Sequence, residues 1–254
     1  MRTLYRTLVE VRALGRRRDV PALLRNFEAC WVASLIDLNI DDLVSDAHLG
    51  NLPVYIRSAG LRAAARGPSI SQLRAALGGA AGKRTNSTPP HVQAVPDSDR
   101  LLGAAGMALA AKSLKSGSAV LAFAQQADLS AIDWGRLLAL CGTHAPPLVL
   151  VLLGAVPQRS SRPIELQRIA SKAGLPGAPP SIQVDAGDAV ALYRVAQESL
   201  LRVRTGGGPV VVECVPSRLD PIALLGRQLL ARGICTRAWL ASVDTTVAGL
   251  LARL

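Results

Sequence analysis

Two apolar runs separated by an amphipathic stretch lie in the middle of the chain. Residues 118–123 (SAVLAF) and 147–153 (PLVLVLL) are short and almost entirely apolar, whereas residues 131–142 (AIDWGRLLALCG) place their apolar side chains at helical spacing. This order is typical of two parallel strands joined by a crossover helix. Because open α/β sheets bind ligands beyond the carboxyl ends of their strands, we expect a candidate site just after residues 123 and 153.

The rest of the chain alternates helical periodicity with short Val-, Leu- and Ile-rich runs bounded by Gly and Pro. We expect helices over residues 2–15, 20–38, 54–66, 69–77, 101–114, 164–173, 189–204, 220–231 and 236–254, and further strands over residues 181–185 and 209–214. Asp188 is expected to cap the helix that follows it. Loop and short extended structure is expected over residues 40–53, and a long loop over residues 82–99, which contain three prolines. The pattern predicts a single α/β domain over residues 1–254, with a parallel sheet flanked by helices.

The net charge of +11 raises the question of a nucleic-acid partner, since a clustered basic face binds phosphate backbones. The only dense basic run is Arg16 to Arg18, and the other arginines fall mostly on the polar faces of the expected helices. We therefore interpret the charge as solvated surface, with docking to an acidic protein surface as the second interpretation. The sequence disfavours a nucleic-acid partner.

Cysteine spacing and hydropathy disfavour several other classes of protein. The four cysteines form no CxxC pair and no Cys/His cluster, so neither a metal site nor a disulfide framework is expected. The amphipathic start of the chain lacks the apolar core of a signal peptide, and the longest apolar run, residues 146–157, is too short to cross a bilayer. We expect a cytoplasmic protein with no membrane partner.

Polar residues with catalytic potential are few. His48, His91 and His144 lie in expected loops or beside prolines, and each is interpreted as a surface histidine. Glu213 ends an expected strand, where a structural hydrogen bond or ion pair is favoured over a catalytic role. The pair Gly82-Lys83 is not a phosphate-binding loop, because the required earlier glycine and the following Ser or Thr are missing.

The order of these elements resembles a known family, the α subunit of thiamine-diphosphate-dependent 2-oxo acid dehydrogenases, such as pyruvate, branched-chain and acetoin dehydrogenase. The likeness covers nearly the whole chain and depends most on residues 184–214 (VDAGD, a helix, then GGGPVVVEC) and on the DPI helix from residue 220. It implies a fold of the thiamine-diphosphate-binding type. It also implies assembly with a β subunit and, for an active member, oxidative decarboxylation of a 2-oxo acid with acyl transfer to lipoamide.

The resemblance also implies where the cofactor site would lie. In the family, a Gly-Asp-Gly at the end of one strand and an Asn after the next strand hold magnesium and the diphosphate of the cofactor. Glycines let the backbone approach phosphates, and hard oxygen ligands suit magnesium. This chain places Ala124, Gln125 and Gln126 at the Gly-Asp-Gly, and Gly154 at the Asn. We expect these four positions to be equivalent to the family site but without its function.

Three further segments depart from the family. Leu49 and Asn51 stand where the family has charged or proton-donating side chains near the cofactor, and His48 is out of register. Asp97 and Asp99 stand where diphosphate would prefer backbone amides, and the loop after residue 154 is shortened to AVPQRSSRP. No catalytic residue and no metal ligand are therefore expected.

These departures leave two main functional hypotheses. The first is a degenerate α-subunit-like protein, or pseudoenzyme, without independent catalysis, which acts as a structural or regulatory partner in a homodimer or with a β-like subunit. The second is an active α subunit, an oxidoreductase acting on 2-oxo acids, with thiamine diphosphate and magnesium in a remodelled site. A basic nucleic-acid binder is a distant third.

Overall fold

The computed structural model describes residues 1–16, 23–46, 49–60, 68–77, 97–125, 130–154 and 179–253. The helices in these ranges are α1 (Arg2–Gly15), α2 (Leu23–Leu35), α3 (Leu52–Arg57), α5 (Ile70–Leu77), α6 (Asp97–Ser113), α7 (Ala131–His144), α9 (Ala189–Arg204), α10 (Pro221–Ala231) and α11 (Arg237–Leu251). The strands are β1 (Leu43–Ser45), β2 (Val120–Gln125), β3 (Leu148–Leu153), β4 (Ser181–Asp185) and β5 (Val210–Val215).

The strands form one sheet in the order β1-β2-β3-β5-β4, and every described pair is parallel. Strands β2 and β3 run side by side from Val120 opposite Leu148 to Gln125 opposite Leu153. Helix α7 connects them, so the crossover predicted from the apolar runs is confirmed. Ser130 begins this helix as an N-cap, because its side chain accepts a hydrogen bond from the backbone N–H of Asp133.

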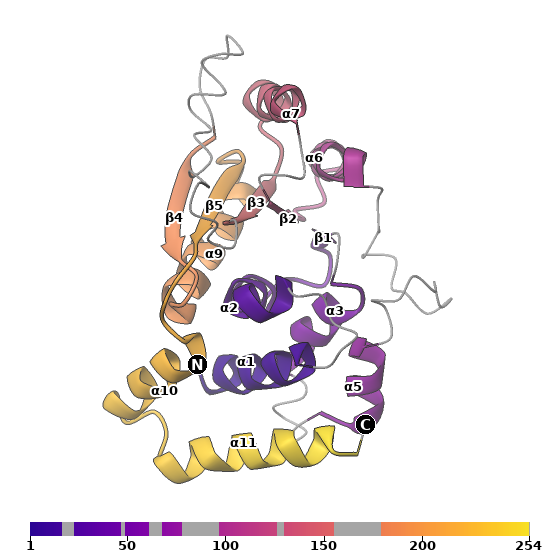
Figure 1. Cartoon of the computed structure of the whole chain (residues 1–254). Coiled ribbons are helices and arrows are strands. Elements are labelled where there is room, and N and C mark those ends of the chain that lie inside the picture. Colours follow the sequence, from indigo (N-terminus) through magenta and orange to yellow (C-terminus); the bar gives the residue numbers. More distant parts are fainter. Residues whose placement is uncertain are drawn as a thin grey trace.

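Alternating side chains of the strands build a core on each face of the sheet. Ala122 and Leu150 face the side covered by α6 and α7, with Trp134 of α7 packed among them. Phe123 and Val151 face the side covered by α2 and α9. In Figure 1 the sheet accordingly lies between these two pairs of helices.

The remaining helices form further layers beyond α2. Helix α1 buries its apolar stripe, including Leu4, Leu8 and Leu14, and packs between α2 and α11. Figure 1 shows α11 as the outermost helix on this side, with α10 beside α1 and α3 next to α5. The candidate site predicted from the sequence lies at the carboxyl ends of the strands in this arrangement.

Most predicted elements agree with the structure, and the differences lie at their ends. The predicted cap at Asp188 is confirmed, since its Oδ1 accepts from Val190 N and Ala191 N at 3.1 and 3.0 Å. The helix expected from residue 101 begins at Asp97, inside the segment expected to be a loop. The helix expected over residues 54–66 is described only as α3, and the one expected over residues 164–173 lies outside the described residues, as does most of the loop over 82–99.

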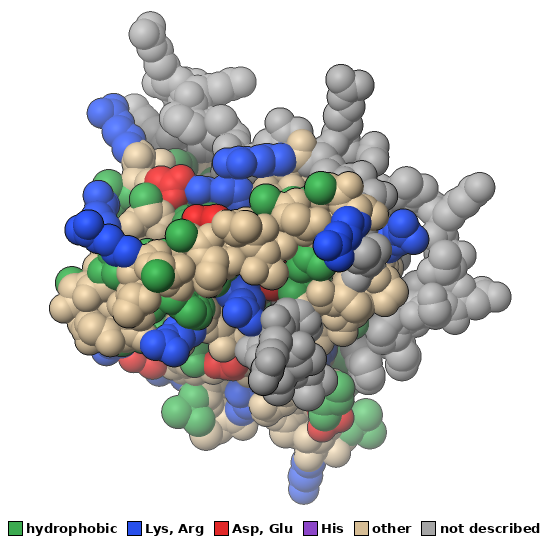
Figure 2. All heavy atoms as spheres, turned by 90° about the horizontal axis from the view of Figure 1, so that it is seen from below, with side chains coloured by type: hydrophobic (Ala, Val, Ile, Leu, Met, Phe, Trp, Pro, Cys, Tyr) green, Lys and Arg blue, Asp and Glu red, His purple; other side chains and the backbone are tan. Residues whose placement is uncertain are grey.

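Basic side chains on the face that carries α11 are interspersed with other groups. Figure 2 shows the face that carries α11, where Lys and Arg side chains are separated by hydrophobic, acidic and other groups. This spacing agrees with the interpretation of the positive charge as solvated surface. In the part of the chain that the structure describes, no helix is long and apolar enough to cross a membrane.

Candidate functional site

The positions predicted for the cofactor site meet at the carboxyl edge of the sheet. Gln125 ends β2 opposite Leu153 of β3, and Gly154 follows directly. The next strand, β5, continues this edge, because Leu153 lies opposite Cys214. The structure therefore brings Ala124, Gln125 and Gly154 to one edge, whereas Gln126 lies outside the described residues.

These positions differ in what they expose at the edge. The side chain of Ala124 is buried in the core under α6 and α7 and leaves only a methyl group there. Gln125 is half-buried at the end of β2. A carboxamide such as that of Gln125 offers one neutral oxygen, whereas magnesium prefers several hard, mostly anionic oxygen ligands.

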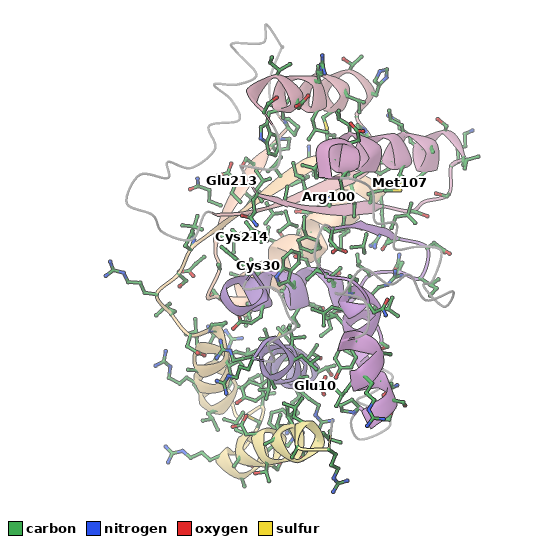
Figure 3. The ribbon with its side chains drawn as sticks, turned by 45° about the vertical axis from the view of Figure 1, so that its right-hand side comes forward. Glu10, Cys30, Arg100, Met107, Glu213 and Cys214 are labelled. Carbon is green, nitrogen blue, oxygen red and sulfur yellow. The ribbon has the colours of Figure 1, made fainter. Side chains whose placement is uncertain are left out.

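Gly154 lies in a space that admits no side chain. Its N–H donates to the carbonyl oxygen of Cys214 at 3.0 Å, which extends the pairing of β3 with β5 by one residue. A Cβ atom built on Gly154 would lie 2.6 Å from Cδ of Pro216 and 2.9 Å from the carbonyl oxygen of Cys214. Both distances are shorter than van der Waals contact allows. The position that an asparagine side chain would occupy is therefore taken by the end of β5 and by Pro216, which follows it. Figure 3 shows Cys214 in β5.

A buried arginine, missed in the sequence, lies at the same edge. Arg100, in the first turn of α6, has a relative exposure of 1 %, and its Nη1 donates to the carbonyl oxygen of Phe123 at 2.6 Å (Figure 3). Alternate carbonyls along β2 face β1, and the carbonyl oxygen of Ala119, the residue just before β2, belongs to the same row and accepts from Leu43 N. Strand β1 ends at Ser45, so the guanidinium meets the next carbonyl of that row.

The helical spacing contained a signal for this burial. Arg100 shares a helix face with Ala104 and Ala108, which lie four and eight residues further on, and both alanines are fully buried. A run of small buried residues in line with an arginine places that arginine on the inner face. The helix was expected to begin at residue 101, one residue after Arg100, so this buried face was not extended to the arginine.

The other predicted departures from the family are spread over neighbouring loops. Leu49 is buried, and its N–H donates to Asp46 Oδ1 at 2.5 Å. Asn51 turns toward α5, where its Nδ2 donates to the carbonyl oxygen of Ala75 at 3.0 Å. Asp99 is exposed, while His48 and the side chain of Asp97 are outside the described part.

Glu213 and His144 behave as predicted. The carboxylate of Glu213 accepts from Ser181 Oγ at 2.6 Å and from Gln183 Nε2 at 2.9 Å, both on the edge strand β4. These bonds join two neighbouring strands, so the structural role expected for Glu213 is confirmed. His144 is exposed at the end of α7, whereas His91 lies outside the described residues.

The described cysteines form no reactive centre. All four are free and buried. Cys30 of α2 lies next to Cys214 of β5 (Figure 3). Burial and, to a smaller extent, a hydrogen bond with Cys214 raise the pKa of the Cys30 thiol well above its ordinary value. Burial also raises the pKa of Cys141 to about 12. Thiols of this kind stay protonated at neutral pH and are poor nucleophiles.

The described residues at the carboxyl edge do not fit a magnesium-bound diphosphate. Across the described ranges, no group of three or more His, Cys, Asp or Glu side chains is placed to hold a metal ion. Gly154 lacks room for a ligand, and Gln125 offers a single amide oxygen. We therefore derive no catalytic step through thiamine diphosphate for this chain.

Comparison with known proteins supports the family resemblance. No protein-family model matches the chain. The chain is 34% identical over 133 residues to the 3-methyl-2-oxobutanoate dehydrogenase subunit alpha of Mycobacterium tuberculosis, in strains CDC 1551 / Oshkosh and ATCC 25618 / H37Rv alike. The match covers 50% of this chain and 35% of the relative. Homology to the α subunit of a 2-oxo acid dehydrogenase is thus confirmed over half of the chain.

Solved structures support the fold. A transketolase mutant from Pichia stipitis aligns with a TM-score of 0.55 at 13% identity, covering 99% of this chain and 44% of that protein. The transketolase of Campylobacter jejuni aligns with a TM-score of 0.51 at 12% identity, covering 84% and 36% of the two chains. The predicted fold class, a parallel α/β sheet of the thiamine-diphosphate-binding type, is confirmed.

Proposed function

We propose that this chain is a degenerate homologue of the α subunit of thiamine-diphosphate-dependent 2-oxo acid dehydrogenases that acts as a structural or regulatory partner of a β-like subunit. It binds neither thiamine diphosphate nor magnesium in the family manner and has no independent catalysis. The family part of this proposal draws on the Mycobacterium tuberculosis relative, whose name identifies it as a subunit. The loss of chemistry draws on the carboxyl edge of the sheet.

Gly154 carries the proposal. A missing ligand can be replaced by a neighbouring residue or by water only where there is room for it. Here the space that a side chain at Gly154 would need is taken by Pro216 and the carbonyl oxygen of Cys214. The neutral Gln125 and the methyl group of Ala124 add no charge to balance a cation.

The partner role draws on what the chain retains. The chain has the parallel sheet, the crossover helix α7 and the helices on both faces that are typical of the thiamine-diphosphate-binding fold. A fold presents its outer surfaces whether or not its ligand site works, so loss of the cofactor site does not by itself remove a surface for a partner subunit. A homodimer is the alternative assembly.

Calorimetric titration with thiamine diphosphate and magnesium tests the loss of the cofactor site. We expect no binding heat and no shift in melting temperature, either for the chain alone or mixed with a β-like subunit. An active α subunit of the family, titrated in the same buffer, shows that the assay detects binding. Saturable binding by the unaltered chain would overturn the degenerate-site proposal and favour an active α subunit with a remodelled site.

A single replacement separates a missing charge from a closed site. Gln125→Asp places a carboxylate at the half-buried end of β2, where the family has its aspartate, and leaves Gly154 untouched. We expect this variant to bind no magnesium diphosphate, because the second position stays closed. Binding restored by Gln125→Asp alone would show that one missing charge, and not the packing at Gly154, had abolished the site.

The partner role is tested by mixing the purified chain with a β-like subunit and measuring the mass of the product by light scattering. We expect a hetero-oligomer that forms equally well with and without thiamine diphosphate. Two separate species at every ratio would overturn the partner role, whatever the outcome of the cofactor titration.

A further inference from the structure

A pocket lies between α3 and α5, two helices that are neighbours in Figure 1. Its volume of about 400 Å³ falls within the range of roughly 300–1,000 Å³ that is typical of small-molecule sites. Ala124, Gln125 and Gly154 do not line it, and the proposed function leaves it unused. Its walls include Asn51, Val54 and Tyr55 at α3 and Gln72, Ala75 and Ala76 of α5.

Hydrogen bonds hold the two walls of this pocket in place. Asn51 Nδ2 donates to the carbonyl oxygen of Ala75 at 3.0 Å, which ties the start of α3 to α5. The hydroxyl of the buried Tyr55 donates to Glu10 Oε2 of α1 at 2.9 Å, which anchors α3 to the core behind the pocket. Because the walls are already ordered, a ligand that enters the pocket pays little of the usual cost of ordering the protein.

The lining of the pocket is uncharged. No charged side chain is among the described residues that line it, although the whole chain carries a net charge of +11. The guanidinium of Arg57 on α3 donates instead to the carbonyl oxygens of Asn39 and Asp42. A charged ligand would leave water for a pocket with no opposite charge to balance it, which is unfavourable. The lining therefore favours an uncharged ligand whose apolar part contacts the valine, tyrosine and alanine side chains of the walls.

Asn51 has an unused hydrogen-bond acceptor. It is the N-cap of α3, where the side-chain oxygen of an asparagine commonly accepts from backbone N–H groups of the first turn, but its side chain makes no such bond. Pro53 lies in that first turn and has no N–H to donate. Asn51 Nδ2 is already bonded to Ala75, so Oδ1 is the half of the carboxamide that has no hydrogen-bond partner among the described residues.

Gln72 has an unused donor on the other wall. Ser69 and Gln72 form a capping box at the start of α5, in which Ser69 N donates to Gln72 Oε1 at 2.9 Å and Gln72 N donates to Ser69 Oγ at 3.2 Å. The first of these bonds fixes the carboxamide of Gln72 and leaves its Nε2 without a partner among the residues that the structure describes. One free acceptor and one free donor group therefore belong to the two walls of the pocket.

We propose that the pocket between α3 and α5 binds a small uncharged molecule that carries an amide group on an apolar or aromatic body. The amide N–H donates to Asn51 Oδ1 and the amide carbonyl accepts from Gln72 Nε2, because these are the two groups that the fold leaves unused. A carboxylate offers no donor to Asn51, and an amidinium offers no acceptor to Gln72. Charge and hydrogen-bond polarity thus select the same class of ligand.

Titration of the isotope-labelled whole chain with benzamide, followed by NMR, tests the proposal. Three compounds with the same ring are the controls: benzoate is an anion with acceptors only, benzamidine is a cation with donors only, and methyl benzoate is uncharged with acceptors only. We expect benzamide to shift the backbone signals of residues 51–58 and 72–76 saturably, and each control compound to bind at least about fivefold more weakly. Absence of saturable binding by benzamide, or equal binding by any control compound, would overturn the proposal.

Gln72→Glu removes the donor and keeps the helix cap. Glutamate supplies the oxygen that accepts from Ser69 N, and its negative charge in the first turn of α5 is favourable, so we expect the melting temperature to stay or rise. The affinity for benzamide should fall at least about fivefold, because an acceptor replaces Nε2. Ala248→Glu adds the same charge at an exposed position of α11 and is the matched control, which should bind benzamide as the unaltered chain does.

Ala75→Leu fills the pocket with a larger side chain. Ala75 is exposed on α5, leucine is a good helix former, and the backbone carbonyl that accepts from Asn51 is kept, so we expect an unchanged melting temperature and no detectable binding of benzamide. Ala241→Leu, at an exposed position of α11, is the matched control and should bind benzamide normally. Undiminished binding by Ala75→Leu, or an equal loss in the two control variants, would overturn the proposal, because benzamide would then bind elsewhere on the chain.

Discussion

Replacing Gly154 with alanine tests the packing that closes the candidate site. The new Cβ atom would lie 2.6 and 2.9 Å from Cδ and Cγ of Pro216 and 2.9 Å from the carbonyl oxygen of Cys214. The proline ring can shift slightly, but the carbonyl oxygen belongs to β5 and accepts the hydrogen bond of Gly154 itself. Relief of the overlap therefore has to move the end of β3 away from β5.

The expected cost follows from two opposing terms. Overpacking in a well-filled region costs about 1–3 kcal/mol. Against this, alanine loses less conformational entropy than glycine on folding, which contributes about 0.4–1 kcal/mol of stability. We expect Gly154→Ala to lower the free energy of unfolding by about 1–2 kcal/mol, and Gly154→Asn, with its larger side chain, by more.

Urea unfolding followed by circular dichroism measures this cost, with Gly106→Ala as the matched control. Gly106 lies in the exposed middle of α6, and a Cβ atom added to it would meet no atom within 4 Å, so alanine there should stabilise the chain by about 0.5–1 kcal/mol. Replacement of glycine by alanine should thus lower the free energy of unfolding at Gly154 and raise it at Gly106. A cycle with Pro216→Ala isolates the contribution of the ring, and we expect Gly154→Ala to cost less in that background.

A neutral or stabilising Gly154→Ala would refute the reasoning, because it would show that the end of β3 has room for a side chain. An undiminished cost in the Pro216→Ala background would assign the overlap to the carbonyl oxygen of Cys214 alone. In either case the equilibrium m-value should stay constant, so that the comparison concerns stability and not a change in the unfolded state.

The remaining predictions concern stability and thiol chemistry. Asp42 is buried and ion-paired, so Asp42→Ala should lower the free energy of unfolding in urea by about 3–5 kcal/mol, whereas Asp41→Ala, at an exposed neighbour, should change it by less than about 0.5 kcal/mol. The pKa of Asp220 is lowered, because hydrogen bonds from Ala223 N and Arg12 outweigh the effect of burial, which raises it. Its carboxylate therefore stabilises the fold above the unfolded pKa of about 3.9, and this stability is lost as the pH falls through the folded pKa; Asp220→Asn should flatten the acid side of the stability curve measured against pH. A thiol reagent should label none of the four cysteines in the native chain and all four in denaturant, since all are buried.

Local sequence signals predicted the parts of the fold that depend on neighbouring residues. The continuous apolar runs predicted β2 and β3, and the amphipathic stretch between them predicted α7. The cap at Asp188 was also predicted from the sequence, because a capping side chain bonds to backbone N–H groups two and three residues away. These features need no knowledge of the tertiary structure.

The closed candidate site could not be derived in the same way. The sequence identified Gln125 and Gly154 as positions without the family ligands, but the contact of Gly154 with Pro216 joins segments that are far apart in the chain. Three-dimensional packing decides whether a glycine marks an open space or a filled one. Arg100 shows the same limit, since a charged residue is expected outside unless the helix face it shares is known to be buried.

Arg100 and Gly154 together bear on the proposed loss of the cofactor site. Removal of ligands alone would leave an open strand edge with unpaired carbonyls, and such an edge could regain its ligands by single substitutions. At this edge the carbonyl oxygen of Phe123 is already hydrogen-bonded by Arg100, and the end of β3 is covered by Pro216. Both contacts stabilise the chain without a cofactor, and each would have to be broken before a ligand could enter. Under the proposal of a degenerate site, regaining the family chemistry would therefore lower stability before it produced any binding.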